Sequence, residues 1–408
     1  MKSIKEIYKI GNGPSSSHTM GPKRAILYMQ DKYKDADYFK VTLYGSLAYT
    51  GKGHLTDKII IQAVAPKKVD VIFDKKEKNI KHPNTMDIIA YKEEKEIGKI
   101  RVYSIGGGSI NIEGEEAKEE KDIYPQTKFE TIFEECKKKN ISLLEYIYEI
   151  EGEEIKYYLK EVLDTMIKGV KEGLNEEGTI PGKLQIPRKA KAIYNKKIDN
   201  ETENFKRTRL LTSYAYATNE RNASGEVIVT APTCGASGVL PAVLYYLKEN
   251  ENIKEEKLIE GLAIAGLIGN IVKENASISG AECGCQAEVG TACSMASAAY
   301  AYIKGNSIDI IECAAEIAME HHLGLTCDPI YGYVQIPCIE RNAVAAIRAI
   351  DSANMAELLY KDRKISFDLV VETMYETGKD LRSHYRETSE GGLAKKYCRN
   401  KYYNDKLE

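Results

Sequence analysis

The cysteines of this sequence gather in one stretch. Six of the nine lie within residues 280–341. Cys327 and Cys338 stand beside prolines, in Asp-Pro and Pro-Cys settings that restrict the backbone. Thiolates held on loops between packed helices are the usual ligands of an iron–sulfur cluster. Free cysteine is also among the most buried residue types, so thiols can simply fill a core. We favour the core interpretation for Cys293 and Cys313, in alanine-rich helical sequence, and the ligand interpretation for Cys327 and Cys338.

A hydroxyl-rich segment precedes a predicted helix near the N-terminus. Residues 13–19 read Gly-Pro-Ser-Ser-Ser-His-Thr, and a helical pattern begins at Pro22. Hydroxyls and backbone N–H groups at a helix start suit an anion such as a substrate carboxylate. The alternative is an ordinary helix cap, for which serine and threonine are preferred. One residue is enough for a cap, so the run of polar side chains favours a binding role.

A second polar segment follows the first predicted strand. Residues 50–54 read Thr-Gly-Lys-Gly-His. The Gly-Lys-Gly step suggests a phosphate loop, but the spacing of that motif is absent. His54 follows glycine-rich backbone, and an imidazole is a usable base near neutral pH. A lone histidine on a loop is more often simply exposed to solvent.

Lys273, at the end of a predicted helix, raises the alternative of a pyridoxal phosphate enzyme, which needs a lysine for its Schiff base. A lysine at this place commonly complements the helix dipole. No glycine-rich phosphate loop accompanies it, and pyridoxal chemistry has no use for the cysteine-rich stretch. The iron–sulfur hypothesis is therefore favoured.

Three long motifs carry a resemblance that spans almost the whole chain. They are GAECGCQAEVGTACSMA, LGLTCDPIYGYVQIPCIERNA and VETMYETGKDLRSHYRETSEGGLA. Together with GPSSSHT and TGKGH, they resemble the iron–sulfur L-serine dehydratases, also called L-serine deaminases, of the single-chain type. The resemblance implies a [4Fe–4S] cluster held by Cys285, Cys327 and Cys338, with the fourth iron left open for substrate.

The resemblance also implies roles for residues outside the cysteine-rich stretch. His54 would be the general base, and Cys398 would be a tail ligand of the open iron in the resting state. The substrate-binding residues would be Ser15, Ser16, Ser17, His18, Thr19, His82 and Asn84. Most of the family has asparagine where Cys234 stands, which leaves a substrate contact from that side chain in doubt. Cys283 is interpreted as a packing residue.

The activity implied by the resemblance is an ammonia-lyase reaction that converts L-serine to pyruvate and ammonia, a step of amino-acid degradation and gluconeogenesis. The iron would act as a Lewis acid in the β-elimination of the hydroxyl group. Two alternatives stay open. One is a related iron–sulfur lyase acting on L-cysteine or L-threonine, and the other is a non-catalytic redox or iron sensor.

Length and composition set the class of protein. The chain has 408 residues, a net charge of −3 and interspersed lysine and glutamate. We expect no nucleic-acid partner, because a protein that binds nucleic acid carries a strongly basic face. The most apolar stretch, residues 258–272, contains polar residues and is shorter than a membrane span. Nine cysteines without an export signal indicate reduced thiols. We expect a cytoplasmic protein with no membrane partner, and a homodimer.

The predicted elements give an α+β domain over residues 1–122, with a mostly antiparallel sheet and flanking helices, followed by an all-helical iron–sulfur domain over 123–408. Strands are predicted from alternating apolar residues at 38–48, 68–74, 86–93 and 99–114. Amphipathic helices are predicted from residue 129 onward, and the glycine run at 106–108 is interpreted as a bulge. Further helices are predicted at 205–219, 237–248, 254–273, 287–304, 308–321, 340–361 and 366–380.

Overall fold

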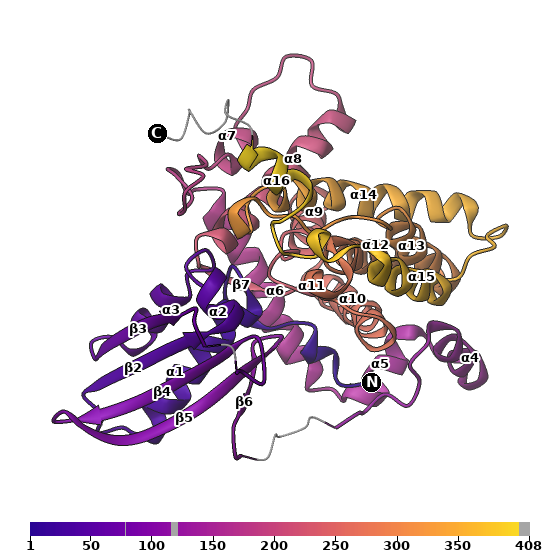
Figure 1. Ribbon diagram of the computed structural model, residues 1–408. Coiled ribbons are helices and arrows are strands. Elements are labelled where there is room, and N and C mark those ends of the chain that lie inside the picture. Colours follow the sequence, from indigo (N-terminus) through magenta and orange to yellow (C-terminus); the bar gives the residue numbers. More distant parts are fainter. Residues whose placement is uncertain (78, 116–120, 400–408) are drawn as a thin grey trace. The chain divides into compact units, whose positions relative to one another are not determined.

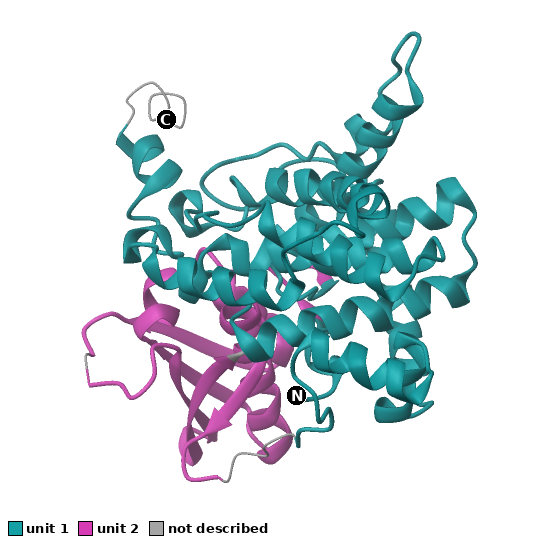
Figure 2. Cartoon of the chain, turned by 90° about the vertical axis from the view of Figure 1, so that its right-hand side faces the viewer, with its two compact units in different colours: residues 1–10, 121–223, 228–408 teal, residues 11–120, 224–227 magenta. Residues whose placement is uncertain are grey.

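The computed structural model describes residues 1–77, 79–115 and 121–399 (Figure 1). The chain divides into two compact units (Figure 2). The α/β unit comprises residues 11–120 and 224–227, and the helical unit comprises residues 1–10, 121–223 and 228–408. The predicted fold class, a mixed α/β part followed by a mostly helical part, is confirmed.

The α/β unit contains a five-stranded sheet with the order β3-β2-β4-β5-β6. Strands β2 and β3 are parallel, and the other neighbours are antiparallel. The strands are β2 (Tyr38–Tyr44), β3 (Lys68–Asp74), β4 (Thr85–Lys92), β5 (Lys95–Gly106) and β6 (Ser109–Ile112). Two further short strands, β1 (Ile10–Asn12) and β7 (Val227–Val229), pair with each other.

Helices α1 (Gly21–Lys32) and α3 (Thr56–Val64) pack against each other and against this sheet. Alternate residues of β2 are buried, because successive side chains of a strand point to opposite faces. The inward residues of the sheet meet the apolar faces of the two helices in one core. This core fixes the segment before α1 and the segment before α3, which carry the two histidines of interest.

Two predicted strands differ from the observed ones. The strand predicted at 38–48 ends at Tyr44, and residues 45–50 form helix α2 (Gly45–Thr50). Gly45 has a φ of 54°, a left-handed conformation that breaks the strand and favours glycine. The strand predicted at 99–114 is two strands, β5 and β6, joined at Gly107 and Gly108, both with positive φ. The pairing of β5 with β6 also shifts register between Ser104 and Gly106. The predicted bulge is therefore present beside the glycine run, but the run itself forms the turn between the two strands.

The helical unit confirms the long helices that the apolar periodicity predicts. Its helices, with short ones included, are α4 (Phe129–Lys139), α5 (Leu143–Glu151), α6 (Ile155–Gly173), α7 (Ala190–Tyr194), α8 (Glu203–Ala223), α9 (Val239–Glu251), α10 (Glu255–Asn275), α11 (Gly280–Cys283), α12 (Thr291–Ile303), α13 (Ile308–Glu320), α14 (Cys338–Leu359), α15 (Phe367–Asp380) and α16 (Gly392–Arg399). Among the described residues, none of the helices is long and apolar enough to cross a membrane.

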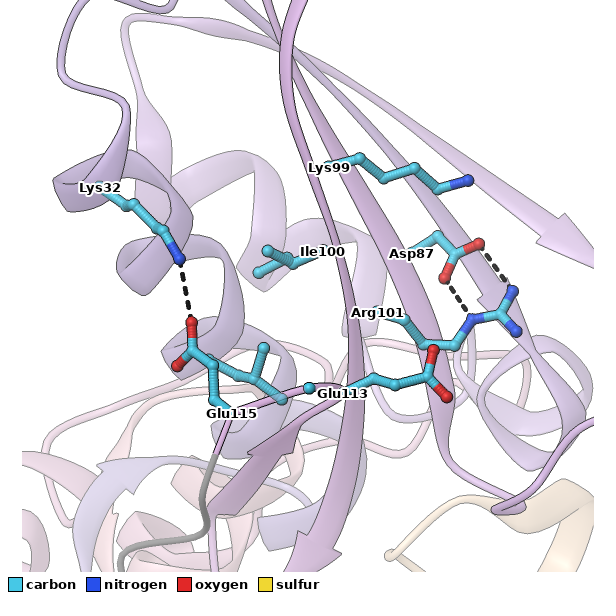
Figure 3. A pocket seen from close by; sticks show the side chains of 9 residues that line it. Lys32, Asp87, Lys99, Ile100, Arg101, Glu113 and Glu115 are labelled. Carbon is cyan, nitrogen blue, oxygen red and sulfur yellow. Dashed lines mark hydrogen bonds and ion pairs between the residues drawn. The ribbon is translucent and has the colours of Figure 1, made fainter.

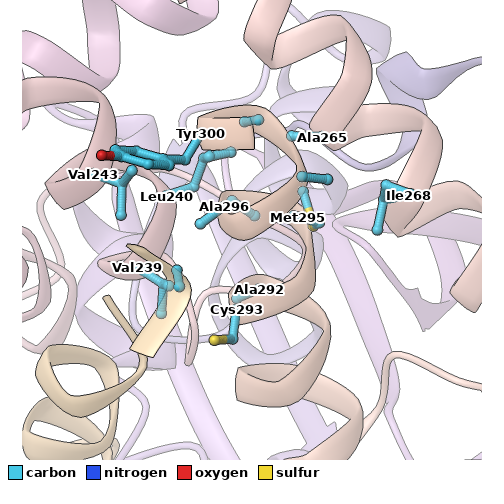
Figure 4. Packing of buried hydrophobic residues seen from close by; sticks show 14 of the residues in the cluster. Val239, Leu240, Val243, Ala265, Ile268, Ala292, Cys293, Met295, Ala296 and Tyr300 are labelled. Atoms are coloured by element: carbon cyan, nitrogen blue, oxygen red, sulfur yellow. The ribbon is translucent and has the colours of Figure 1, made fainter. Parts of the chain in front are cut away.

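Helix α12 is the centre of the helical unit. Every residue of it except Tyr302 is buried, and it packs against α9, α10, α13 and α14. Figure 4 shows its apolar side chains among those of α9 and α10. Alanine and serine make up most of its length, so neighbouring backbones approach closely. Cys293 lies on this helix among apolar side chains, and its thiol donates to the Ala345 carbonyl at 3.3 Å. Cys313 is likewise buried in the same core, on α13.

Candidate functional site

The hydroxyl-rich segment forms a helical turn. Residues Ser16–Met20 make one π-helical turn that leads directly into α1, so the helix begins earlier than the predicted start at Pro22. Ser15 caps this turn, because its hydroxyl accepts a hydrogen bond from the His18 backbone N–H at 3.2 Å. The capping interpretation therefore applies to Ser15. The Ser16 hydroxyl makes no hydrogen bond with the part of the chain that the structure describes.

Two hydrogen bonds, one donated from each side, connect this turn to the segment that contains His54. The Thr19 hydroxyl donates to the His54 backbone carbonyl at 2.9 Å. The Thr56 hydroxyl donates to the His18 backbone carbonyl at 2.6 Å. Both threonines are completely buried, so each fixes a histidine backbone. The two imidazole rings consequently lie 4.7 Å apart, measured between ring centroids.

His18 is held on both sides by serine hydroxyls. Its Nδ1 lies 2.9 Å from the Ser17 hydroxyl, and its Nε2 lies 2.9 Å from the Ser46 hydroxyl. Ser46 belongs to α2, so the helix that replaces the end of the predicted strand supplies this partner. Burial lowers the pKa of His18 well below its usual value, and the neighbouring His54 lowers it further. His18 is thus a neutral, firmly positioned imidazole at neutral pH.

The hydrogen bond of His54 determines which ring nitrogen can accept a proton. Nδ1 lies 3.1 Å from the Thr50 carbonyl oxygen, which can only accept, so Nδ1 carries the hydrogen. Nε2 therefore holds the lone pair. Burial lowers the pKa of His54 to about 4, and the hydrogen bond to Thr50 acts in the opposite direction. The imidazole is neutral over the physiological range and can accept a proton at Nε2.

His82 and Asn84 form a turn of their own before β4. The Asn84 backbone N–H donates to His82 Nδ1 at 3.1 Å, and the Thr85 hydroxyl donates to the His82 carbonyl at 2.5 Å. The Asn84 amide nitrogen donates to the Ser104 carbonyl at 3.4 Å. The Asn84 amide oxygen is buried and has no hydrogen-bond partner among the described residues. That oxygen is a polar group that a ligand or water can satisfy.

In the helical unit, Gln286 fixes the position of Cys285. Cys285 immediately precedes the short helical turn η3 (Gln286–Gly290). The Gln286 side chain donates to the carbonyls of Cys283 and Met374 and accepts from the Gly324 backbone N–H and the Thr377 hydroxyl. These bonds join the Cys285 segment to α15 and to the loop that leads to Cys327. The Cys285 thiol therefore sits on a rigid support.

Backbone and carboxylate hydrogen bonds hold the loop of Cys327. The Cys327 N–H donates to the Tyr385 carbonyl at 2.8 Å, and the Glu387 N–H donates to the Cys327 carbonyl at 2.7 Å. The adjacent Asp328 is 2% exposed and accepts hydrogen bonds from Thr326, Arg341 and the Leu393 backbone N–H. The segment around Tyr385 therefore fixes the backbone of Cys327 through these hydrogen bonds.

Cys338 is the first residue of α14, whose N-terminal end favours a thiolate. The thiols of Cys285 and Cys327 are hydrogen-bonded to each other; this bond, followed by burial, raises the pKa of Cys327 well above its usual value. Burial, followed by the charge of Cys285, raises the pKa of Cys338, while Arg341 lowers it. The structure therefore brings together the three cysteines that the resemblance implies as ligands.

The chemistry of this donor set fits an iron–sulfur cluster: three buried thiols come from three segments, one at a helix N-terminus and beside an arginine. Within the described residues, no three His, Cys, Asp or Glu side chains are grouped so as to hold a single metal ion. An iron–sulfur cluster would instead take one thiolate on each of three irons. Cys285, Cys327 and Cys338 are the residues that would hold it.

Three other cysteines have distinct surroundings. Cys283 is fully buried, and a Cβ added at Gly378 of α15 would lie 2.5 Å from the Cys283 Cβ, which accords with a packing role. Burial raises the pKa of Cys234. Cys398 is exposed on α16 and hydrogen-bonded to Tyr331, which lies in the loop between Cys327 and Cys338. The tail that follows Cys398 from residue 400 lies outside the described residues.

A separate pocket of about 590 Å³ lies in the α/β unit beside α1, β4, β5 and β6 (Figure 3). Two ion pairs line it: Lys32 with Glu115 at 2.9 Å, and Arg101 with Asp87 at 2.7 Å. These pairs neutralise most of its charge. None of the site residues predicted from the sequence lines this pocket.

Comparison with known proteins identifies the family. The family model of the serine dehydratase alpha chain matches residues 76–394, and that of the beta chain matches residues 3–70. This chain belongs to the serine dehydratase family. It combines both parts in one chain, as the resemblance implies.

Relatives of the same arrangement are similar over nearly their whole length. An L-serine dehydratase of Haemophilus influenzae is 41% identical, with 97% of this chain and 99% of the relative covered. L-serine dehydratase 2 of Escherichia coli is 40% identical over the same shares. An L-serine dehydratase of Streptomyces coelicolor is 38% identical, with 96% and 98% covered.

Sequence reasoning missed four residues that support the dehydratase motifs: Ser46, Gln286, Asp328 and Arg341. Three of them stand next to a candidate ligand cysteine or within three residues of one, in the GCQ, CDP and CIER motifs. Their position beside the cysteines was therefore a usable signal. Ser46 carried no such signal, because it appeared to lie in a strand.

Proposed function

We propose that this enzyme is an L-serine ammonia-lyase that forms pyruvate and ammonia with a [4Fe–4S] cluster. The observation that supports it most directly is the grouping of Cys285, Cys327 and Cys338 in a chain that belongs to the serine dehydratase family. A cluster with three protein thiolates has one iron open, and that iron would act as a Lewis acid toward the leaving hydroxyl group.

The proposed base is His54. Its Nδ1–H is engaged by the Thr50 carbonyl, so Nε2 takes the proton from Cα of serine. As the Cα–H bond breaks, a double bond forms between Cα and Cβ, and the Cβ–O bond breaks with departure of hydroxide. A neutral imidazole is required for this step, and the lowered pKa keeps His54 neutral.

The SSSHT segment is proposed to bind the substrate carboxylate. The Ser16 hydroxyl lacks a partner among the described residues, so it can donate to an oxygen of the carboxylate. His18, positioned by Ser17 and Ser46, presents its ring beside His54. Ser15 and Thr19 then act by fixing this turn. His82 and Asn84 are proposed as further polar residues of the substrate site.

The proposal is tested with protein purified without oxygen. Iron and sulfide are measured per chain, and pyruvate release is followed with L-serine, with L-cysteine and L-threonine as competing substrates. We expect four iron and four sulfide per chain and the highest kcat/KM with L-serine. A cluster-loaded protein that releases no pyruvate from L-serine would refute the proposed function. A preference for cysteine or threonine would reassign the substrate.

We also propose that the enzyme is a cytoplasmic homodimer. The proposed location follows from the expectation that the nine cysteines are reduced thiols. The tail-ligand role of Cys398 remains a proposal. It is checked by comparing the cluster's electron paramagnetic resonance spectrum in the wild type and in Cys398→Ala. The proposed homodimer is tested separately, by measuring the mass of the protein in solution with light scattering.

A further inference from the structure

Helix α14 carries a group of exposed apolar side chains. The exposed fractions of Val344, Met355, Leu358 and Leu359 lie between 44% and 83%. Each other helix of the described residues has at most one exposed large apolar side chain. Single exposed apolar residues are ordinary on a protein surface, whereas a group of them on one face marks an interaction surface. The exposed residues of α14 therefore indicate a contact with another molecule.

Most of these residues lie on one face of the helix, which we call the α14 stripe. The stripe consists of Val344, Arg348, Asp351, Met355 and Leu358, which fall within an arc of roughly 80° when successive residues are rotated by about 100°. The opposite side of α14 is buried in the helical unit. The stripe is therefore apolar toward its two ends and carries one arginine and one aspartate near its middle.

A groove of about 350 Å³ lies along the stripe. Its apolar wall comes from Val344, Ile347 and Met355 of α14 and from Ile317 of the neighbouring α13. Interfaces between proteins are centred on apolar side chains that fill pockets of the opposite surface. The groove gives the stripe such a pocket.

The two charged residues of the stripe each have one side open. Arg348 donates from Nη1 to the His321 carbonyl at 2.7 Å, and Asp351 accepts at Oδ1 from Arg207 at 2.7 Å. Arg348 Nη2 and Asp351 Oδ2 make no hydrogen bond with the part of the chain that the structure describes, and the two side chains do not pair with each other there. Both can therefore bind a group of opposite charge on a partner.

The order of residues along the stripe is self-complementary. Val344 and Met355 are equally far from the point midway between positions 349 and 350, and so are Arg348 and Asp351. Consider two antiparallel copies of α14 related by a two-fold axis through that point. Val344 then faces the partner's Met355, and Arg348 faces the partner's Asp351. Each contact occurs twice, as in every two-fold symmetric interface. A lipid surface, by contrast, offers no counterpart for the carboxylate of Asp351.

We propose that the α14 stripe is the surface through which two copies of this chain associate, with their α14 helices antiparallel. This inference rests on one part of the proposed function, the homodimer, and names its contact surface. It is independent of the proposed cluster and of the reaction with serine, because the stripe contains none of the proposed site residues.

The test measures the dimer Kd of the full-length protein by analytical ultracentrifugation. The wild type should sediment at twice the chain mass of 45.7 kDa. Met355→Glu should raise the Kd by about 100-fold or more, because one substitution removes an apolar contact on both sides of the axis. Tyr157→Glu, at a position of α6 that is 79% exposed, is the matched control and should leave the Kd unchanged.

Charge reversals test the antiparallel register. Arg348→Asp and Asp351→Arg should each raise the Kd by about 10- to 100-fold, because two pairs of like charges replace two ion pairs. The double variant Arg348→Asp/Asp351→Arg should bind at least about tenfold more tightly than either single variant, since it restores both pairs with exchanged signs. The recovery should be incomplete, because Arg207 then lies beside an arginine.

The outcomes separate the surface from the rest of the proposed function. A wild type that sediments as a monomer at every concentration would overturn both the surface and the homodimer. A dimer whose Kd is unchanged in Met355→Glu, or whose double variant is no tighter than the single ones, would overturn the surface alone. Circular dichroism shows whether the variants are folded, and Val344→Glu replaces Met355→Glu if that variant is not. Absence of pyruvate release from an intact dimer would refute the lyase activity instead.

Discussion

The pH dependence of turnover tests the environment of His54. Burial lowers the pKa of His54 from the ordinary value of 6.5 to about 4. A base must be neutral to accept a proton, and the acid limb of kcat/KM reports its pKa in the free enzyme. At pH 5, a histidine with a pKa of about 4 is roughly 90% neutral, whereas one with the ordinary pKa is only about 3% neutral.

The assay follows pyruvate release from L-serine between pH 5 and pH 7, where the groups of serine itself do not titrate. Cluster absorbance and circular dichroism are recorded at each pH to show that the enzyme stays intact. We expect kcat/KM at pH 5 to remain within about twofold of its value at pH 7. His54→Asn should lower kcat by about 10²- to 10⁴-fold and keep the cluster.

A fall of about 25-fold between pH 7 and pH 5, with an intact cluster, would show that the base titrates like a solvated histidine. The burial and the hydrogen bond to Thr50 would then not describe the working enzyme. Turnover retained by His54→Asn would remove His54 from the mechanism altogether.

Three further predictions concern stability and the remaining residues. Gly21→Ala should destabilise the fold by about 1–3 kcal/mol in urea denaturation, because its Cβ would collide with the Ser104 side chain; unchanged stability would contradict this packing. Burial lowers the pKa of His322 to about 4, despite its hydrogen bond to the Ala318 carbonyl. The contribution of neutral His322 to the free energy of unfolding is therefore fully present above pH 6.5 and is lost as the pH falls toward 4, by up to about 3 kcal/mol. The free energy of unfolding of His322→Asn should depend less on pH than that of the wild type. Equal pH dependence of the two proteins would refute this. Cys283→Ser should keep its iron, since Cys283 packs against α15; loss of iron would instead make it a ligand.

The helices of the helical unit could be predicted because their apolar residues recur with helical spacing. Glycine, proline and polar residues mark where these helices end. The strand at 38–44 was predicted for the same kind of reason, from alternation. Its end was not predicted, because Leu47 is in phase with Phe39, Val41 and Leu43, so the alternation continues past Gly45. Only the backbone shows that Gly45 adopts a positive φ and starts a helix.

Some residues of the candidate site could be predicted from the sequence, and others could not. The identities of the cysteines and of His54 came from motifs, which are local in sequence. Their partners did not, because the hydrogen bonds between Thr19 and His54 and between Ser46 and His18 join positions 35 and 28 residues apart.

The most direct measurement is the iron content of single alanine variants made without oxygen. Cys285→Ala, Cys327→Ala and Cys338→Ala should each lose the cluster, with its absorbance and turnover, while Cys293→Ala and Cys313→Ala, in the helical core, should keep four iron per chain. Wild-type iron and turnover in any of the first three variants would contradict the proposed ligand set.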